Sequence, residues 1–153
     1  MGVGKYKMKL IKDIHFLKQK SEEVKTDDEA KEIIKDLEDS LDLKQGIGLS
    51  AIQIGIRKQV SIIRMKDFKL DLINPKILDK DKRFRVSHEG CLSLPGLYID
   101  TSRYYYITFE NGLEPNRKKY VIEGLQAVCL QHEIHHQQGK LIIDKDVKWR
   151  KRR

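Results

Sequence analysis

Two histidines stand four residues apart near the end of the chain, in the segment His132-Glu133-Ile134-His135-His136. On a helix this spacing aims both imidazoles from one face at a single metal ion, and the glutamate beside the first can act as a base on water. His132 and His135 could chelate instead, at a spacing of three. We favour His136, because it lies about 40° from His132 around a helix, whereas His135 lies about 60° to the other side.

A catalytic metal site of this kind usually has three protein ligands and one position left open for water. The seventeen residues after His136 contain no Glu, His or Cys, and only Asp144 and Asp146 remain there as candidates. Upstream, Cys91 is the best candidate, because a thiolate flanked by glycine and turn residues can be presented without steric interference. We therefore predict that Cys91, His132 and His136 bind one divalent metal ion, and this donor set suits iron, zinc, nickel or cobalt.

The composition fits a small enzyme without specifying one. The 153 residues are enough for one core and too few for two ordinary domains, so we expect a single domain over residues 1–153. No apolar run is long enough to span a membrane and no signal peptide is visible, which favours a soluble, cytoplasmic protein without a membrane partner. The two cysteines are expected to form no disulfide, since the cytosol is reducing.

Positive charge gathers at the end of the chain. The formal net charge is +8, and residues 148–153 contribute five positive charges to it. Such a basic tail can bind RNA or the ribosome electrostatically. We favour a frayed, solvated terminus, because short blocks of charge are often tails. No motif indicates DNA binding.

A first helix is predicted over residues 27–41, where Thr26 to Glu29 form a capping box ahead of apolar residues at helical spacing. The middle of the chain has the pattern of a sheet, and its last two strands flank a loop with Asn111-Gly112 and form a hairpin-like antiparallel pair. The predicted strands are 59–64, 69–73, 84–87, 104–110 and 118–123.

A second predicted helix carries the two histidines. It begins near Gly124 and ends at Gly139, a suitable C-cap glycine. The apolar positions 125, 128 and 129 continue the stripe of the histidines at steps of three and four, so the histidines are expected to face the core. Burial of ionisable side chains there favours metal ligation. The apolar stretch 141–143 is expected to add a strand or to pack against an edge.

Three segments together resemble the motifs of peptide deformylases, in that family's order and spacing. They are 46–53 (Gly-Ile-Gly-Leu-Ser-Ala-Ile-Gln), 89–93 (Glu-Gly-Cys-Leu-Ser) and 132–136 (His-Glu-Ile-His-His), and the match spans most of the chain. The resemblance implies an α+β fold with antiparallel β-sheets around a central helix that carries the HExxH motif. It also implies removal of the formyl group from N-formylmethionyl peptides and nascent chains, with Fe²⁺ as the physiological metal and Zn²⁺ as the usual, less active replacement. The donor set alone also admits Ni²⁺ or Co²⁺.

The resemblance also implies roles for individual residues. Glu133 would take a proton from water and pass it to the leaving amine. The side-chain amide of Gln53 and the backbone N–H of Leu92 would stabilise the negative charge on the formyl oxygen. Gln53 could instead simply cap a loop. Glu89 is expected to hold the Cys91 loop or to pair with Arg103, outside the metal ligands.

The same resemblance places the substrate peptide. Gly46 and Gly48 would let the backbone approach it closely, and the main chain near Gly46 and Gly90 could pair with it as an added strand. The methionine side chain needs an apolar slot, for which the candidates are Leu125, Val128 and Cys129, with Ile47 on the other side. Core packing is the alternative role of these helix residues, and for Cys129 it is the favoured one.

Two positions depart from the family pattern: His135 stands where aspartate is usual, and Ile52 where proline is usual. We predict that His136→Ala abolishes metal binding and that His135→Ala retains it. Three other functions remain as alternatives. A zincin-type peptidase would need a downstream ligand, a non-catalytic metal-binding homologue would not need Glu133 or Gln53, and an RNA-binding protein would rely on the basic tail.

Overall fold

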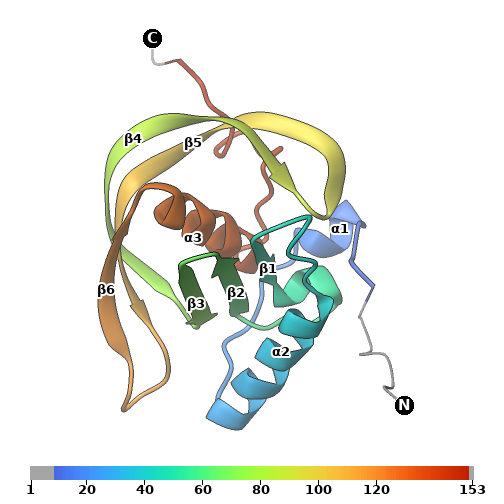
Figure 1. Ribbon diagram of the computed structural model, residues 1–153, viewed down its shortest axis with the longest axis vertical. Helices are drawn as coiled ribbons and strands as arrows, with labels where there is room; N and C mark the ends of the chain where they lie inside the picture. Colours follow the sequence, from blue (N-terminus) through green and yellow to red (C-terminus); the bar gives the residue numbers. More distant parts are fainter. Residues whose placement is uncertain (1–8, 152–153) are drawn as a thin grey trace.

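The computed structural model describes residues 9–151 and contains two antiparallel three-stranded sheets. The first has the order β1-β2-β3, with β1 at Gly48–Ser50, β2 at Val60–Met65 and β3 at Phe68–Ile73. The second has the order β4-β5-β6, with β4 at Lys76–Cys91, β5 at Leu94–Asn111 and β6 at Lys118–Glu123. Helix α3 (Gly124–Gln137) lies between them (Figure 1). This confirms the predicted α+β fold around the HExxH helix.

Helix α2 spans Asp27–Ser40, one residue less than predicted. Its N-terminus is capped by Thr26, whose hydroxyl accepts a hydrogen bond of 3.2 Å from the backbone N–H of Glu29. Ala30, Ile33 and Leu37 are buried against the outer face of the β1-β2-β3 sheet. The chain also forms a short helix α1 (Ile14–Leu17) and a 3-10 helix η1 (Ala51–Ile54) directly after β1, neither of which the pattern had indicated.

The β4–β5 hairpin is much longer than the predicted strands 84–87 and 104–110. Its two strands have 16 and 18 residues and arch over α3 (Figure 1). Nine of the 16 residues of β4 are exposed and eight are charged, and three register irregularities interrupt the alternation of the pair. The period of two is therefore lost from the sequence. The turn at the end of the hairpin carries Cys91 and Leu92.

Helix α3 is buried on almost every side because both sheets pack on it. The expected buried stripe of apolar residues does not include Leu125, whose exposed fraction is 64%, whereas Val128 and Cys129 are buried as expected. Gly139 follows the helix with φ at +77°, as a C-cap glycine requires, and a Cβ there would overlap the carbonyl oxygen of Lys18.

The segment after α3 packs on the molecule without forming a named strand. Leu141 and Ile142 are buried, and Leu141 packs in one cluster with Leu17 of α1 and Ile52 of η1. The stretch 141–143 therefore packs on the molecule, but against these helices and not as an added strand. The backbone N–H of Trp149 donates 2.9 Å to the carbonyl of Asp100, and its ring lies 4.3 Å from the guanidinium of Arg83. The interpretation of the tail as frayed is therefore wrong for residues 148–150, and 152–153 lie outside the described residues. Among the described helices none is long and apolar enough to cross a membrane.

Candidate active site

Three side chains from two elements converge at one end of α3. The Nε2 atoms of His132 and His136 are 3.1 Å apart, and Sγ of Cys91, at the end of β4, is 3.4 Å from His136 Nε2. All three donor atoms lie within 4.8 Å of one another. His135 points elsewhere, since its Nδ1 is 2.8 Å from a guanidinium nitrogen of Arg103. The structure thus brings together the predicted ligand set, with His136 rather than His135.

These donors fit a divalent metal ion. Burial holds the pKa of His136 well below its usual value, so its imidazole is neutral and has a lone pair to offer. Burial alone would lower the pKa of His132, but its hydrogen bonds with Cys91 and Glu89 outweigh burial and raise this pKa to about 10, so a metal ion has to displace a proton there. Once that proton and the proton of the Cys91 thiol have left, the lone pairs of the two facing Nε2 atoms and of the sulfur converge at one point. A metal ion satisfies all of these lone pairs at once, and one thiolate with two imidazoles is a donor set for iron, zinc, cobalt or nickel.

His132 is oriented from behind by Glu89. Its Nδ1 donates 2.8 Å to a carboxylate oxygen of Glu89, which leaves Nε2 free to face the metal position. Glu89 also accepts from Thr101 (2.8 Å) and from Arg103, whose Nε lies 2.9 Å away. Burial alone would raise the pKa of Glu89, but the hydrogen bonds from His132 and Arg103 outweigh it and hold this pKa well below the usual range. The predicted pairing of Glu89 with Arg103 is confirmed.

Glu133 points from α3 toward β1. Its side chain is 3% exposed, and one carboxylate oxygen accepts 2.9 Å from the hydroxyl of Ser50. Gly48 leaves room for the other oxygen, because a Cβ there would lie 2.6 Å from it. Burial raises the pKa of Glu133, against the opposing effects of His132 and the Ser50 bond. A raised pKa suits a group that must accept a proton near neutral pH and give it back.

Gln53, in η1, caps the turn after β1 and also directs its amide nitrogen toward the Cys91 loop. Its amide oxygen accepts 2.9 Å from the backbone N–H of Ser50 and so closes a capping box. This fixes the amide nitrogen, which donates 3.1 Å to the hydroxyl of Ser93 and lies 3.8 Å from Sγ of Cys91. Ile52, at the position where proline was expected, is fully buried.

The remaining predicted residues line one cleft of about 820 Å³ that also contains Cys91, His132 and Glu133. Its walls come from β1 and the loop before it, from the tip of the β4–β5 hairpin, and from α3. The predicted lining residues found there are Gly46, Ile47, Gly48, Gly90, Leu92, Leu125, Val128 and Cys129. Burial raises the pKa of Cys129 to about 12, so this thiol stays protonated.

Several functional neighbours were missed by sequence reasoning. Ser50, Ser93 and Thr101 hold Glu133, Gln53 and Glu89 through the bonds given above. Ser50 and Ser93 lie inside the quoted motifs, which was the available signal. Thr101 had none, because it reaches Glu89 only through the pairing of β4 with β5. The exposed rim residues Leu97 and Tyr98 at the hairpin tip were also missed.

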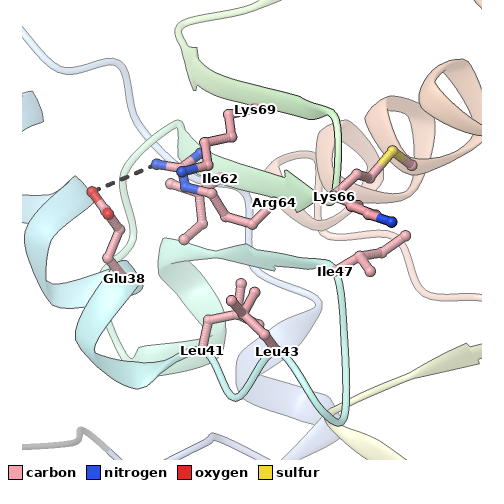
Figure 2. Close-up of a pocket in the computed structure, with 9 residues that line it drawn as sticks. Glu38, Leu41, Leu43, Ile47, Ile62, Arg64, Lys66 and Lys69 are labelled. Atoms are coloured by element: carbon pink, nitrogen blue, oxygen red, sulfur yellow. Dashed lines mark ion pairs between the residues drawn. The ribbon is translucent and has the colours of Figure 1, made fainter.

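A second hollow of about 510 Å³ lies on the α2 side of the β1-β2-β3 sheet. Figure 2 shows Leu41, Leu43 and Ile47 along its apolar side and the ion pair between Glu38 and Arg64 on its rim. Ile47 lines both hollows, whereas none of the metal-binding candidates lies in the second one. The metal-binding candidates therefore belong to the larger cleft, and Ile47 forms part of the wall between the two.

Comparisons with known proteins show which family this chain is similar to. The family described as polypeptide deformylase matches residues 8–152. A peptide deformylase of Finegoldia magna is 36% identical over 135 residues, which cover 85% of this chain and 83% of the relative. The crystal structure of the Thermotoga maritima peptide deformylase matches with a TM-score of 0.80 at 28% identity, covering 90% of this chain and 95% of that one. A peptide deformylase from Synechococcus elongatus, solved in complex with actinonin, matches with a TM-score of 0.82 at 34% identity, covering 97% and 86%.

Proposed function

The chain belongs to the peptide deformylase family, and we propose that it removes the formyl group from N-formylmethionine at the start of new polypeptides and releases formate. One observation carries this proposal: Cys91, His132 and His136 converge beside the buried carboxylate of Glu133 at one cleft. A metal-binding triad with an adjacent proton acceptor is the arrangement that amide hydrolysis needs.

The three donors would hold one divalent metal ion, with Fe²⁺ proposed as the physiological one and Zn²⁺, Ni²⁺ or Co²⁺ as replacements. Such an ion, when bound, acts as a Lewis acid and lowers the pKa of water near it. Glu89 would keep His132 in the tautomer that presents Nε2 to the ion, through the 2.8 Å bond at Nδ1.

Glu133 would move the proton. It accepts a proton from the attacking water, whose oxygen forms a bond to the formyl carbon. It then donates that proton to the leaving amine as the carbon–nitrogen bond breaks, which leaves formate and a free N-terminus. Ser50 holds one carboxylate oxygen and Gly48 makes room for the other, so the acid/base is fixed before substrate arrives.

Negative charge develops on the formyl oxygen during attack and needs hydrogen-bond donors. Gln53 can supply its amide nitrogen, because its amide oxygen is already held by Ser50. The backbone N–H of Leu92, directly after Cys91 in the hairpin turn, would be the second donor.

The substrate would bind along the free edge of β1. Ile47 accepts a 2.7 Å bond from the backbone N–H of Arg64, so its carbonyl faces β2, and the alternation of a strand turns the carbonyl of Gly48 toward the opposite edge. An extended peptide can pair there, between β1 and Gly90 of the hairpin. The methionine side chain would enter the apolar slot lined by Leu125, Val128 and Cys129. Gly48 packs closely on Glu133, and a site this tight at its acid/base would favour formyl, the smallest acyl group, over larger ones.

The alternatives explain less of the site. A zincin-type peptidase takes its third ligand downstream of the HExxH motif, whereas here the third donor near the histidines is Cys91. A non-catalytic metal-binding homologue would need neither the buried Glu133 nor an amide aimed at the site by Gln53.

The test is release of formate from formyl-Met-Ala-Ser by anaerobically purified protein, beside Glu133→Ala, with metal content measured on both. We expect the parent to release formate and Glu133→Ala to keep its metal but lose activity by about 10²–10⁴-fold. Binding of actinonin to both proteins would show that the cleft is intact. Metal without formate release by the parent would support the non-catalytic alternative.

Nascent chains are the proposed partner, and contact with the ribosome through the basic tail stays a prediction. Trp149 packs on Arg83, so deleting the tail would also disturb the hairpin. Replacing Lys148, Arg150 and Lys151 by glutamine is the cleaner change. Salt-dependent sedimentation with ribosomes that is equal for parent and variant would remove this contact from consideration.

A further inference from the structure

His135 is the one residue of the HExxH segment whose chemistry remains unused. It lies next to a proposed ligand but contacts Arg103, with 2.8 Å between its Nδ1 and a terminal guanidinium nitrogen. Arginine has donors only, so Nδ1 must be the acceptor and the ring proton must sit on Nε2. The position expected to hold a carboxylate thus holds a neutral acceptor.

Arg103 is held from two sides. It is 1% exposed, and its Nε and one terminal nitrogen donate to the two carboxylate oxygens of Glu89. Its other terminal nitrogen donates to His135. Glu89 already neutralises the buried guanidinium, so the second partner need only accept a hydrogen bond and need not carry charge.

The contacts continue to the proposed metal site. Glu89 accepts from Nδ1 of His132 at 2.8 Å, and Nε2 of His132 faces Nε2 of His136 at 3.1 Å. Without an acceptor at position 135, one buried N–H group of Arg103 would be left unpaired, and the guanidinium would lose one of the two partners that fix its orientation.

We propose that His135 is a positioning residue, which fixes the Arg103 guanidinium as a hydrogen-bond acceptor and thereby holds Glu89 where it orients the metal ligand His132. The inference rests on the proposed metal site, but it concerns a residue outside that site. It also explains how the chain can do without a carboxylate at position 135.

Three variants test whether position 135 requires a hydrogen-bond acceptor, a charge or a particular side-chain shape. In His135→Asn and His135→Asp, Oδ1 takes the place of Nδ1, whereas in His135→Leu a methyl group does. The readouts are the Co²⁺ dissociation constant of the metal-free protein, the thiolate-to-cobalt absorption band, and the histidine tautomers of the Zn²⁺-loaded parent by ¹⁵N NMR. His15→Asn, at an exposed histidine, is the control.

We expect His135→Leu to weaken Co²⁺ binding by about 10–100-fold and His135→Asn and His135→Asp to stay within about threefold of the parent. The absorption band should keep its position in the Asn variant, because His135 is not a ligand. Three results would each overturn the inference. They are equal Co²⁺ affinities of His135→Leu and the parent, a His135→Asn variant that binds as weakly as His135→Leu, and a proton on Nδ1 of His135 in the parent. The tautomer of His135 in the parent tests the inference even if His135→Leu does not fold. A parent that binds no Co²⁺ would instead refute the proposed function itself, and this inference with it.

Discussion

Replacing Gly48 by alanine probes how tightly β1 packs against the proposed acid/base. A Cβ at this position would lie 2.6 Å from one carboxylate oxygen of Glu133 and 3.3 Å from the carbonyl oxygen of Ile62. The carboxylate cannot easily turn aside, because Ser50 holds its other oxygen at 2.9 Å and the side chain is 3% exposed. Ordinary contact begins at 3.4 Å, so the carboxylate must move by about 0.8 Å.

A displacement of this size sets the expected magnitude. Misplacing a catalytic group by about 1 Å can cost about 100-fold in rate, or ~2.7 kcal/mol in the activation barrier. The three atoms nearest to this Cβ belong to Glu133 and Ile62 and not to the metal-binding candidates, so metal content should be preserved. We therefore expect Gly48→Ala to bind metal like the parent and to lose about 100-fold in kcat/KM for formyl-Met-Ala-Ser, chiefly through kcat.

Gly46→Ala is the matched control. A Cβ there would lie 2.8 Å from Cδ1 of Leu92, which is the movable end of a flexible side chain. We expect a smaller loss, within about tenfold and chiefly in KM, because the peptide edge is disturbed while Glu133 stays in place. The assay is formate release with metal analysis and thermal unfolding of each variant. Parental kcat in Gly48→Ala, or an equal loss of kcat in the two variants, would refute the reasoning.

Three further predictions concern stability and reactivity. Gly139→Ala should lower the free energy of unfolding by at least ~2 kcal/mol, because it adds a clash with the carbonyl of Lys18 to the strain of a left-handed backbone. Gly96→Ala has the same strain, with φ at +78°, but open space around it, so it should lose only ~1 kcal/mol. Chemical denaturation of both variants measures the difference. Equal losses would contradict the clash. Cys129, with its pKa raised to about 12 by burial, should resist iodoacetamide at pH 8 until the protein unfolds, as peptide mapping can check. Because the pKa of Glu89 is lowered in the folded state, its carboxylate should stabilise the metal-free protein at pH values above the unfolded pKa near 4.5. This contribution to the free energy of unfolding should be lost as the pH falls from there toward the folded pKa. Glu89→Gln should reduce this dependence of stability on acid pH. Parallel curves of stability against pH for the parent and Glu89→Gln would contradict this prediction.

The metal-binding candidates were accessible to sequence reasoning because their spacing is a local property. His132 and His136 are one helical turn apart, and any helix over these residues puts them on one face. Cys91 was reached by eliminating downstream donors and by resemblance. Its contact with the histidines depends on where the β4–β5 hairpin folds over α3, which no local pattern specifies.

The supporting residues were harder to predict for a related reason. Thr101 reaches Glu89 across a strand pair whose register shifts between Val86 and Glu89. A bulge inserts an unpaired residue and changes which side chains share a face, so the alternation read from sequence fails at that point. The prediction that Leu125 is buried was wrong for a different reason. Leu125 lies in the first turn of α3, where the helix is open to the cleft and an apolar residue need not be buried.

The tail shows where composition misleads. Charge density predicted a solvated terminus, but Val147 is buried and the backbone N–H of Ser102 donates 2.8 Å to its carbonyl. Backbone pairing with a free strand edge does not depend on side-chain charge, and charged side chains can point to solvent from a paired segment. A charge block therefore constrains the side chains of such a segment more than its backbone.

The arrangement of the two sheets explains why adjacent residues of one helix serve different roles. His132 and Glu133 are separated by about 100° around α3, so they face different sheets. His132 is held by Glu89 of the β4-β5-β6 sheet, and Glu133 by Ser50 of the β1-β2-β3 sheet. The proposed metal orientation and proton transfer thus depend on different sheets, although hydrogen bonds of Asn111 with Asp71 and Ile73 also join these sheets directly. A change at Gly48 acts on Glu133 and spares the metal ligands, whereas a change at His135 acts through Arg103 and Glu89 on His132. The Gly48 and His135 variants are therefore expected to differ in metal affinity.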